Sequence, residues 1–288
     1  MNDIKSPLSG HICHKKLETK DFLLTGEKFD LYHDAAWDML ITTPVPEQLE
    51  KYYQSDAYKP HQHRSKSILD RVYNYIRKRG YQYKLKLIKS YHPKAKSVLD
   101  YGTATGEFLQ FMQQETFIVS GVEPNKTARE QANELLNNKV SVSIDTLTGS
   151  FDVITLWHVL EHLPDLDSVI DKLKKHLRPG GIILLAVPNF KSYDAQYYKM
   201  HWAAYDVPRH LWHFSPLSIQ KLFSKHQLEV KAQKPLFFDS FYVSLLSEQY
   251  KTGKKRLFSA LYRGFLSNIK ASKTGQYSSM IYVISSMD

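Results

Sequence analysis

The sequence predicts an α/β protein in which a largely parallel sheet is covered by helices on both faces. Two observations carry this prediction. Short apolar runs alternate with amphipathic helical segments from about residue 97 to residue 232. The run 182–187 is apolar at every position, as expected for a strand buried on both faces.

The composition is that of an ordinary globular protein with an excess of basic residues. The chain has 288 residues and a formal net charge of +10 at pH 7. No apolar run reaches the roughly 18 residues that span a membrane, and the first residues lack the apolar core of a secretion signal. Cys13 is the single cysteine, which is compatible with a reducing compartment. We therefore expect a cytoplasmic protein.

Three domains are expected. Residues 1–63 are polar and contain Pro44 and Pro46, so we predict an irregular N-terminal appendage. Residues 64–96 hold eleven basic residues and one acid, and their apolar spacing predicts a basic helical cover with an interruption at Gly80. Residues 97–288 then form the α/β domain, with a helical insertion at about 237–278.

Within that domain each element follows from a local pattern. Apolar runs predict strands at 98–101, 117–122, 140–144, 152–157, 181–187, 228–232 and 280–284. Amphipathic spacing predicts helices at 106–114, 125–136, 167–177 and 215–225, and Asn125 and Ser215 are suitable N-caps for two of them.

The first strand leads into a glycine-containing turn, Asp100-Tyr101-Gly102-Thr103-Ala104-Thr105-Gly106. Gly102 and Gly106 allow the backbone to approach a nucleotide-like ligand closely. The second apolar run ends about 20 residues later at Glu123-Pro124, where an acid can accept hydrogen bonds from the two hydroxyls of a ribose.

Two further blocks follow in order, 151–163 (FDVITLWHVLEHL) and 177–189 (LRPGGIILLAVPN). With these four blocks the chain resembles the class I S-adenosylmethionine-dependent methyltransferases over about 97–230, about half its length. The resemblance implies a Rossmann-like seven-stranded mixed sheet of order 3-2-1-4-5-7-6, with the last strand antiparallel. It also implies S-adenosyl-L-methionine as cofactor and S-adenosyl-L-homocysteine as product.

The same resemblance assigns the cofactor contacts. The acid at the end of the first strand holds the methionine amino group, the acid after the second strand holds the ribose, and the 144–146 segment flanks the adenine. Ala104 stands where the family commonly has a third glycine, and we expect binding to survive this change. The predicted cofactor residues are Asp100, Gly102, Thr103, Gly106, Glu123, Pro124, Asp145, Thr146 and Trp157.

Catalytic candidates lie in two histidine-rich segments. His158 follows the fourth strand, and Arg209, His210 and His213 follow the fifth. A histidine can take a proton near neutral pH, and an arginine can bind a phosphate or carboxylate of the acceptor. Trp202, Tyr205, Trp212 and Phe214 are predicted to wall an apolar acceptor.

No metal site is predicted. His158 and His162 lack an identified third ligand, and Glu161 and His162 are interpreted as structural residues that begin a helix. His11, Cys13, His14 and His33 resemble, in position only, the N-terminal zinc module of some sugar methyltransferases. One cysteine does not complete such a site, so this module is interpreted as degenerate.

These observations favour methyl transfer to oxygen or carbon of a small-molecule or lipid-linked acceptor. The Asp/Asn-Pro-Pro-Tyr motif for exocyclic amines of nucleic acid bases is absent. Two alternatives stay open: an RNA methyltransferase that uses the basic 64–96 face, and a cofactor-binding module without turnover. A nicotinamide-dependent dehydrogenase is disfavoured because the glycines do not match G-x-G-x-x-G.

The basic insertion at 237–278 is a candidate lid, partner surface or peripheral membrane contact. The acceptor and the oligomeric state are not predicted.

Overall fold

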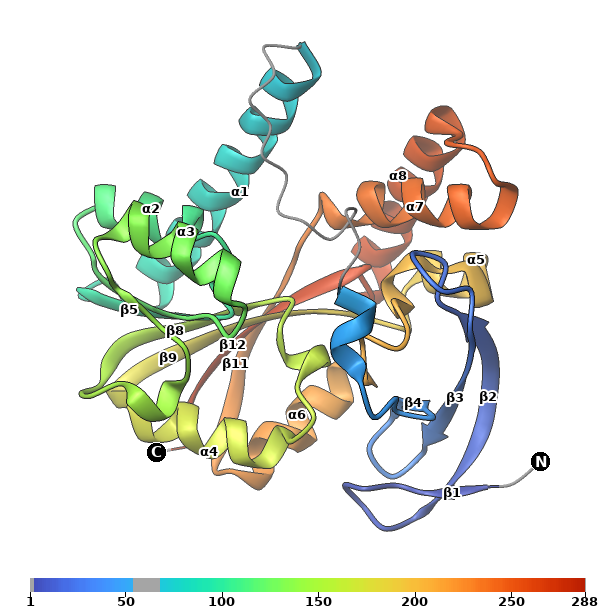
Figure 1. The fold of residues 1–288 in the computed structure, drawn as a ribbon, viewed down its shortest axis with the longest axis horizontal. Helices are drawn as coiled ribbons and strands as arrows, with labels where there is room; N and C mark the ends of the chain where they lie inside the picture. Colours follow the sequence, from blue (N-terminus) through green and yellow to red (C-terminus); the bar gives the residue numbers. More distant parts are fainter. Residues whose placement is uncertain (1–2, 54–67, 288) are drawn as a thin grey trace. The chain divides into compact units, whose positions relative to one another are not determined.

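The computed structural model describes residues 3–53 and 68–287, with side chains described from residue 75 onward in the second range (Figure 1). The chain divides into two compact units. The described residues of the first unit are 3–53, 158–166 and 186–282. Those of the second unit are 68–157, 167–185 and 283–287.

A seven-stranded sheet has the order β11-β12-β9-β8-β5-β6-β7. In chain order this is 3-2-1-4-5-7-6, so the predicted topology is confirmed. Strand β5 pairs in parallel with both β6 and β8, and β6 pairs in parallel with β7. The strands are β5 (Ser97–Tyr101), β6 (Ile118–Val122), β7 (Val140–Ser141), β8 (Phe151–Trp157), β9 (Leu177–Pro188), β11 (Leu228–Pro235) and β12 (Ser279–Ser286).

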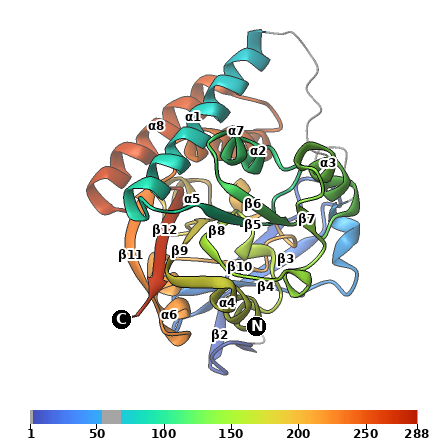
Figure 2. The ribbon, with the colours of Figure 1, turned by 90° about the vertical axis from the view of Figure 1, so that its left-hand side faces the viewer.

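In the second unit, helices lie on both faces of the strands (Figures 1 and 2). Helices α2 and α3 lie on one face of β5, β6 and β8, and α4 lies on the other. The predicted cap of α3 is confirmed, because the Asn125 side chain accepts a hydrogen bond from the Ala128 amide at 3.0 Å. The helices are α1 (Ile68–Tyr91), α2 (Glu107–Gln114), α3 (Lys126–Leu136) and α4 (Leu166–His176).

Helix α1 differs from two predictions, the interruption at Gly80 and the extent of the basic cover. It runs through Gly80 without a break, because a single glycine in a helix of 24 residues only lowers its stability. The predicted basic helical cover at 64–96 starts outside the described residues, coincides with α1 over residues 68–91 and is not helical over residues 92–96.

The N-terminal segment is not irregular in its described part, and this prediction is wrong. It forms an antiparallel sheet of order β1-β2-β3-β4-β10. The polar sequence of β2 hides the alternation, which leaves Cys13 and Thr19 buried while most of their neighbours stay accessible. The strands are β1 (Ile4–Lys5), β2 (Ile12–Lys20), β3 (Lys28–Asp34), β4 (Met39–Thr43) and β10 (Trp212–His213).

The predicted boundary between appendage and catalytic domain also differs in the structure. Strand β10 comes from the segment after β9 and pairs with β4, with Trp212 opposite Ile41 and His213 opposite Leu40. Residues 3–53 and 186–282 therefore belong to one compact unit rather than to separate domains.

That unit has its own hydrophobic core, in which side chains of β3 and β4 pack with those of residues 195–207. Its 3₁₀ helices are η1 (Leu49–Tyr53), η4 (Leu160–His162), η5 (Lys199–His201) and η6 (Ala203–Tyr205). Its α-helices are α5 (Tyr193–Tyr198), α6 (Pro216–Lys225), α7 (Asp239–Thr252) and α8 (Leu257–Thr274), so the predicted helical insertion is present. Among the described residues, no helix combines the length and the apolar character that crossing a membrane requires.

Candidate functional site

The turn after β5 has the backbone that its sequence predicts. Gly102 has φ 79° and Gly106 has φ 81°, both in the left-handed region that glycine tolerates. Ala104 has φ 49°, so it adopts a similar left-handed conformation in spite of its Cβ. The amides of Gly102 and Thr103 donate to the Val122 carbonyl at 2.8 and 3.1 Å, which ties the turn to the end of β6.

Asp100 is buried at the end of β5, with 3% of its surface exposed. Its carboxylate accepts a hydrogen bond from the Thr155 hydroxyl at 2.5 Å. Burial raises the pKa of Asp100 to about 6, although the Thr155 hydrogen bond opposes this shift. An ammonium group beside this carboxylate would restore its charge balance, which fits the predicted contact with the methionine amino group.

Glu123 lies at the end of β6 and accepts two backbone hydrogen bonds. The amides of Ala104 and Asn125 donate to its two oxygens at 2.9 Å each. Burial raises the pKa of Glu123, and these hydrogen bonds oppose the shift. The carboxylate thus joins the glycine turn to the start of α3, and each of its oxygens has a second lone pair for a ribose hydroxyl.

The adenine-side residues lie on a 3₁₀ helix, η3 (Ile144–Thr146). Asp145 is exposed and forms an ion pair with Lys172 at 2.8 Å. The Thr146 hydroxyl donates to the Ser143 carbonyl at 2.7 Å. Pro124 adjoins Glu123, and its carbonyl accepts from Arg129 at 2.8 Å. The role of Asp145 and Thr146 in adenine binding, and that of Pro124 in cofactor binding, stay predictions.

Trp157 ends β8 beside α2, and its ring meets that of Phe108 edge-on at 5.6 Å. The Lys84 ammonium of α1 lies 3.8 Å from the centroid of the indole ring. Sequence reasoning missed Lys84, because only the fold brings α1 beside the end of β8. The indole Nε1 is buried without a hydrogen-bond partner among the described residues. This atom, together with the turn and the two buried acids, fits a polar nucleotide-like cofactor.

His158 follows Trp157 directly and has a left-handed backbone with φ 59°, which is unusual for histidine and typical of functional sites. Its Nε2 lies 2.9 Å from Asp239 Oδ2, and its Nδ1 lies 3.4 Å from Glu161 Oε1. Burial alone lowers the pKa of His158, but the two carboxylates outweigh burial and raise this pKa to about 10. The imidazole is therefore protonated near neutral pH, which disfavours the predicted role as a base.

Arg209 is buried in an ion-pair network. Its Nη2 donates to Asp21 at 2.8 Å and to Asp206 at 2.6 Å, its Nε donates to Asp206 at 2.9 Å, and its Nη1 donates to the Tyr52 carbonyl at 3.1 Å. Because every guanidinium nitrogen donates within the protein, these contacts favour a structural role over the predicted binding of an acceptor anion.

The His213 side chain also makes a hydrogen bond within the protein. The Thr42 hydroxyl donates its single proton to the His210 carbonyl at 2.6 Å, so it accepts from His213 Nε2 at 2.9 Å. Burial lowers the pKa of His213 to about 3, so the ring is neutral. These contacts favour a structural histidine on β10 over the predicted base.

The aromatic residues predicted to wall the acceptor are buried instead. Trp202 and Tyr205 belong to the hydrophobic core of their unit. The Trp212 indole donates to the Leu163 carbonyl at 2.7 Å, and Phe214 is fully covered. These contacts correct the prediction, because the side chains stabilise the 188–214 segment rather than line an open wall.

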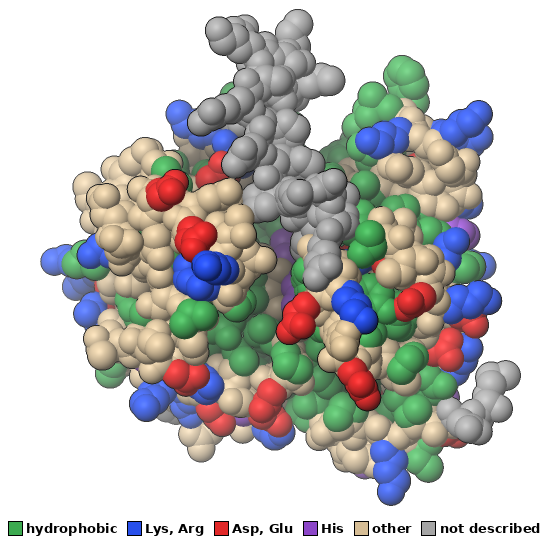
Figure 3. Space-filling model, viewed as in Figure 1, with side chains coloured by type: hydrophobic (Ala, Val, Ile, Leu, Met, Phe, Trp, Pro, Cys, Tyr) green, Lys and Arg blue, Asp and Glu red, His purple; other side chains and the backbone are tan. Residues whose placement is uncertain are grey.

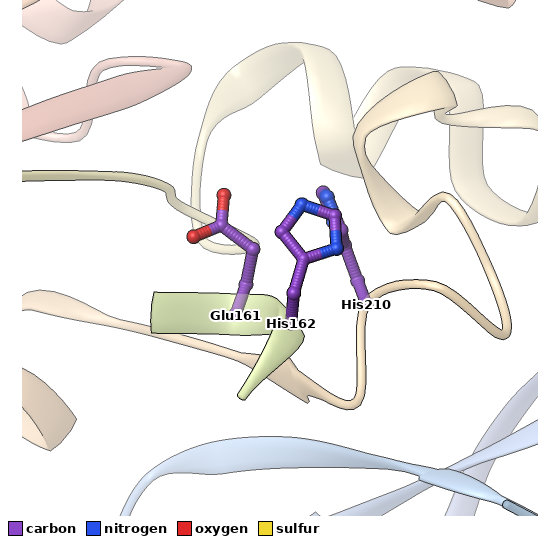
Figure 4. Close-up of side chains that lie close together, drawn as sticks. All are labelled: Glu161, His162 and His210. Atoms are coloured by element: carbon purple, nitrogen blue, oxygen red, sulfur yellow. The ribbon is translucent and has the colours of Figure 1, made fainter. Parts of the chain in front are cut away.

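His210 has a different environment from His213. Its Nδ1 donates to the Ala204 carbonyl at 2.9 Å, so Nε2 carries the lone pair. Burial lowers the pKa of His210 well below its usual value, which keeps the ring neutral. His162 and Glu161, interpreted from sequence as structural, lie beside it (Figure 4). Their spacing from His210 gave no signal, because the fold joins segments almost 50 residues apart.

Comparisons with known proteins agree with this geometry. A family model described as a methyltransferase domain matches residues 73–233, more than half of the chain. A ubiquinone biosynthesis O-methyltransferase of Pectobacterium atrosepticum is 33% identical over 104 residues, covering 33% of this chain and 43% of that protein. A protein of the same name from Idiomarina loihiensis is 29% identical over 170 residues, covering 54% of this chain and 70% of that one. The chain thus spans less than half the length of the first of these relatives.

A solved structure, that of the mycolic acid cyclopropane synthase CmaA1 with SAH and CTAB, is similar over 69% of this chain and 83% of that one. Its sequence identity to this chain is 14% and the TM-score is 0.48. The family match, the strand order and the glycine turn between two buried acids lead to one conclusion. The chain belongs to the methyltransferase-domain family of class I S-adenosylmethionine-dependent methyltransferases, and its cofactor is S-adenosyl-L-methionine.

Proposed function

We propose that this protein transfers a methyl group from S-adenosyl-L-methionine to oxygen or carbon of a small-molecule or lipid-linked acceptor, with oxygen favoured. The relatives named as O-methyltransferases support oxygen. The observation that carries the proposal is the end of β8. There Trp157 completes the proposed cofactor residues, and the next residue, His158, begins a set of partly or fully buried titratable side chains that the cofactor does not require.

The residues on the cofactor side bind S-adenosyl-L-methionine and orient its methyl group. When bound, S-adenosyl-L-methionine supplies a methyl group activated by its positive sulfur. We propose that Asp100 binds the methionine amino group, that Glu123 binds the ribose, and that the turn at 102–106 lets the backbone approach. Correct alignment of nucleophile, methyl and sulfur then supplies most of the rate acceleration.

On the acceptor side, the two predicted bases take different roles. His210 has an unprotonated Nε2 because its Nδ1 is fixed as a donor to the Ala204 carbonyl. It can therefore receive the proton of an acceptor hydroxyl as the new carbon–oxygen bond forms. His158 is protonated between Asp239 and Glu161, so it can donate a hydrogen bond to the acceptor oxygen.

The first test is calorimetric titration with S-adenosyl-L-methionine and S-adenosyl-L-homocysteine, with NAD as the negative control. We expect binding of the first two alone. Binding of neither would remove the proposal. Turnover is then measured as S-adenosyl-L-homocysteine released with a panel of hydroxylated small molecules, lipid-linked alcohols and RNA. Binding without turnover on any acceptor would favour the non-catalytic alternative, and turnover on RNA alone would favour the nucleic acid alternative.

We also propose that helix α8 contacts an anionic lipid surface. This helix leaves a row of large apolar side chains exposed, and Phe258 is 89% exposed. Lys254, Lys255 and Arg256 precede the helix, and its sequence contains no acidic residue. Figure 3 shows hydrophobic side chains with Lys and Arg beside them over the α7–α8 region. The exposed apolar residues of α8 are Leu257, Phe258, Leu261, Tyr262, Phe265 and Ile269.

An apolar helix face with basic flanks is the pattern of a helix that lies in the interface of an anionic membrane. Flotation with vesicles of phosphatidylglycerol and phosphatidylcholine tests this. We expect the wild type to float with the anionic vesicles and Phe258→Ser with Leu261→Ser to reduce floating at least about tenfold. Ile118→Ser, which removes an exposed apolar residue of β6, is the matched control and leaves floating unchanged. Equal floating of all three proteins, or none by the wild type, would refute the contact.

A further inference from the structure

A second cluster of side chains in the first unit goes beyond methyl transfer. It consists of Glu161, His162 and His210, which we call the 161/162/210 cluster. Glu161 and His162 lie on η4, directly after β8, and His210 lies in the loop before β10. One ligand atom from each residue lies within 4.8 Å of the other two (Figure 4).

Both imidazoles present an unprotonated nitrogen. His162 Nδ1 lies 3.0 Å from the Arg209 carbonyl and 3.2 Å from the Tyr53 hydroxyl, which can also accept, and His210 Nδ1 lies 2.9 Å from the Ala204 carbonyl. Because a carbonyl oxygen only accepts, each Nδ1 carries the proton and each Nε2 carries a lone pair. A backbone carbonyl that fixes Nδ1 in this way is the usual outer partner of a metal-binding histidine.

The third member, Glu161, is a buried carboxylate without a hydrogen bond. It is 1% exposed, and neither of its oxygens has a hydrogen-bond partner among the described residues. Its ion-pair partner is His158, whose Nδ1 lies 3.4 Å from Oε1 and whose Nε2 lies 2.9 Å from Asp239 Oδ2. Among the described residues, Glu161 thus shares this imidazole with a second carboxylate.

The cluster thus brings together lone pairs from one carboxylate and two imidazoles, with no proton donor among the three atoms. Buried acceptors that face one another are costly unless a cation lies between them. We propose that the 161/162/210 cluster binds one divalent transition-metal cation, through a carboxylate oxygen of Glu161 and the Nε2 atoms of His162 and His210.

The ligand set determines the kind of metal. Imidazole favours Zn²⁺, Co²⁺ or Fe²⁺ over Mg²⁺ and Ca²⁺, which prefer oxygen ligands. Three protein ligands leave at least one coordination position open, as in catalytic rather than structural zinc sites. With its Nε2 lone pair donated to the ion, His210 acts as a ligand and no longer as the proton acceptor proposed above.

The site also explains features that the methyl-transfer proposal leaves unused. The Arg209 carbonyl accepts from His162, and the Arg209 side chain is fixed by Asp21 and Asp206. This buried ion-pair network therefore holds in place the carbonyl that orients one ligand, in the manner of an outer coordination shell.

Calorimetric titration of the chelator-treated full chain with ZnCl₂, and separately with MgCl₂, tests the inference. We expect one equivalent of Zn²⁺ to bind, at least about tenfold more tightly than Mg²⁺. Glu161→Gln and His210→Ala each weaken Zn²⁺ binding by about tenfold or more. His14→Ala is the matched control, because His14 also pairs with a carboxylate, that of Asp3, but is exposed on β2. This variant binds Zn²⁺ as the wild type does.

The visible absorption spectrum of the Co²⁺-loaded wild type gives a second readout that does not depend on how the variants fold. An intense four- or five-coordinate spectrum, lost when Zn²⁺ is added, supports the site. Absence of stoichiometric binding of both Zn²⁺ and Co²⁺ by the wild type would overturn it, as would unchanged binding by folded Glu161→Gln and His210→Ala. Titration with S-adenosyl-L-methionine separates these outcomes from failure of the methyl-transfer proposal.

Discussion

The cofactor turn and the segment after β9 build their sites in different ways. In the turn, Asp100, Ala104 and Glu123 are close in sequence, and backbone amides make most of the contacts. In the later segment, side chains meet across large separations: Arg209 and Asp21 lie 188 residues apart, and His162 and the Arg209 carbonyl 47 apart. The contacts of the glycine turn are thus encoded locally, whereas those of the segment proposed to serve the acceptor depend on the completed fold.

The largest effect is expected from removal of the Arg209 side chain, which tests whether this segment depends on contacts between distant residues. Arg209→Met leaves Asp21 buried without its partner, so we expect the free energy of unfolding to fall by about 3–5 kcal/mol. Urea unfolding followed by circular dichroism measures this, with the exposed Arg256→Met as the control. A stable variant that loses only acceptor affinity would instead restore the role predicted from sequence.

On the cofactor side, loss of a charged group is expected to raise the free energy of unfolding, whereas loss of Arg209 is expected to lower it. Burial raises the pKa of Asp100 to about 6 from an ordinary value of 3.8, so the folded state holds its proton more tightly than the unfolded state. The contribution of Asp100 to stability is therefore favourable at low pH and is lost as pH rises from about 4 to 6.

Asp100→Asn should consequently raise the free energy of unfolding at pH 7 by roughly 2–3 kcal/mol, while binding of S-adenosyl-L-methionine falls. Urea unfolding at pH 4 and pH 7, combined with calorimetric titration, measures both effects. A variant that is less stable at pH 7 would show that Asp100 is balanced by the protein itself.

Removal of the Glu123 side chain is expected to have a smaller effect, which we expect in cofactor affinity. Glu123→Ala removes the acceptor for the Ala104 and Asn125 amides as well as for the ribose, so we expect cofactor affinity to fall at least about tenfold, or ~1.4 kcal/mol. Calorimetric titration measures this, and Glu130→Ala on the exposed side of α3 is the control. Unchanged affinity would refute the ribose assignment.

The smallest expected effect concerns Ala104. Its left-handed backbone costs about 1 kcal/mol that glycine does not incur. Ala104→Gly should therefore raise the free energy of unfolding by about that amount without weakening cofactor binding. A lower midpoint of thermal unfolding would mean that the Cβ makes a contact more favourable than the strain.

The same difference explains which features were predictable from sequence. The caps of α3 and α6 and the positive φ angles of Gly102 and Gly106 follow from short-range patterns, and the strand order was implied by the family resemblance. The strand β2 was missed because its polar sequence conceals alternating burial. The pairing of Arg209 with Asp21 and the approach of His210 to Glu161 were not predicted. The residues involved are far apart in the chain, and a single sequence does not distinguish a buried polar residue from an exposed one.

Strand β10 has a consequence for how this chain can be altered by recombination. Because Trp212 and His213 add a final strand to the sheet made by β1 to β4, residues 3–53 and the histidine-rich segment form one structural unit that has to be exchanged as a whole. A chimera that exchanges only the N-terminal part with a relative would pair a foreign β4 with the β10 of this chain and disturb the position of the neighbouring His210. An exchange between relatives that preserves this sheet therefore requires both segments to be transplanted together.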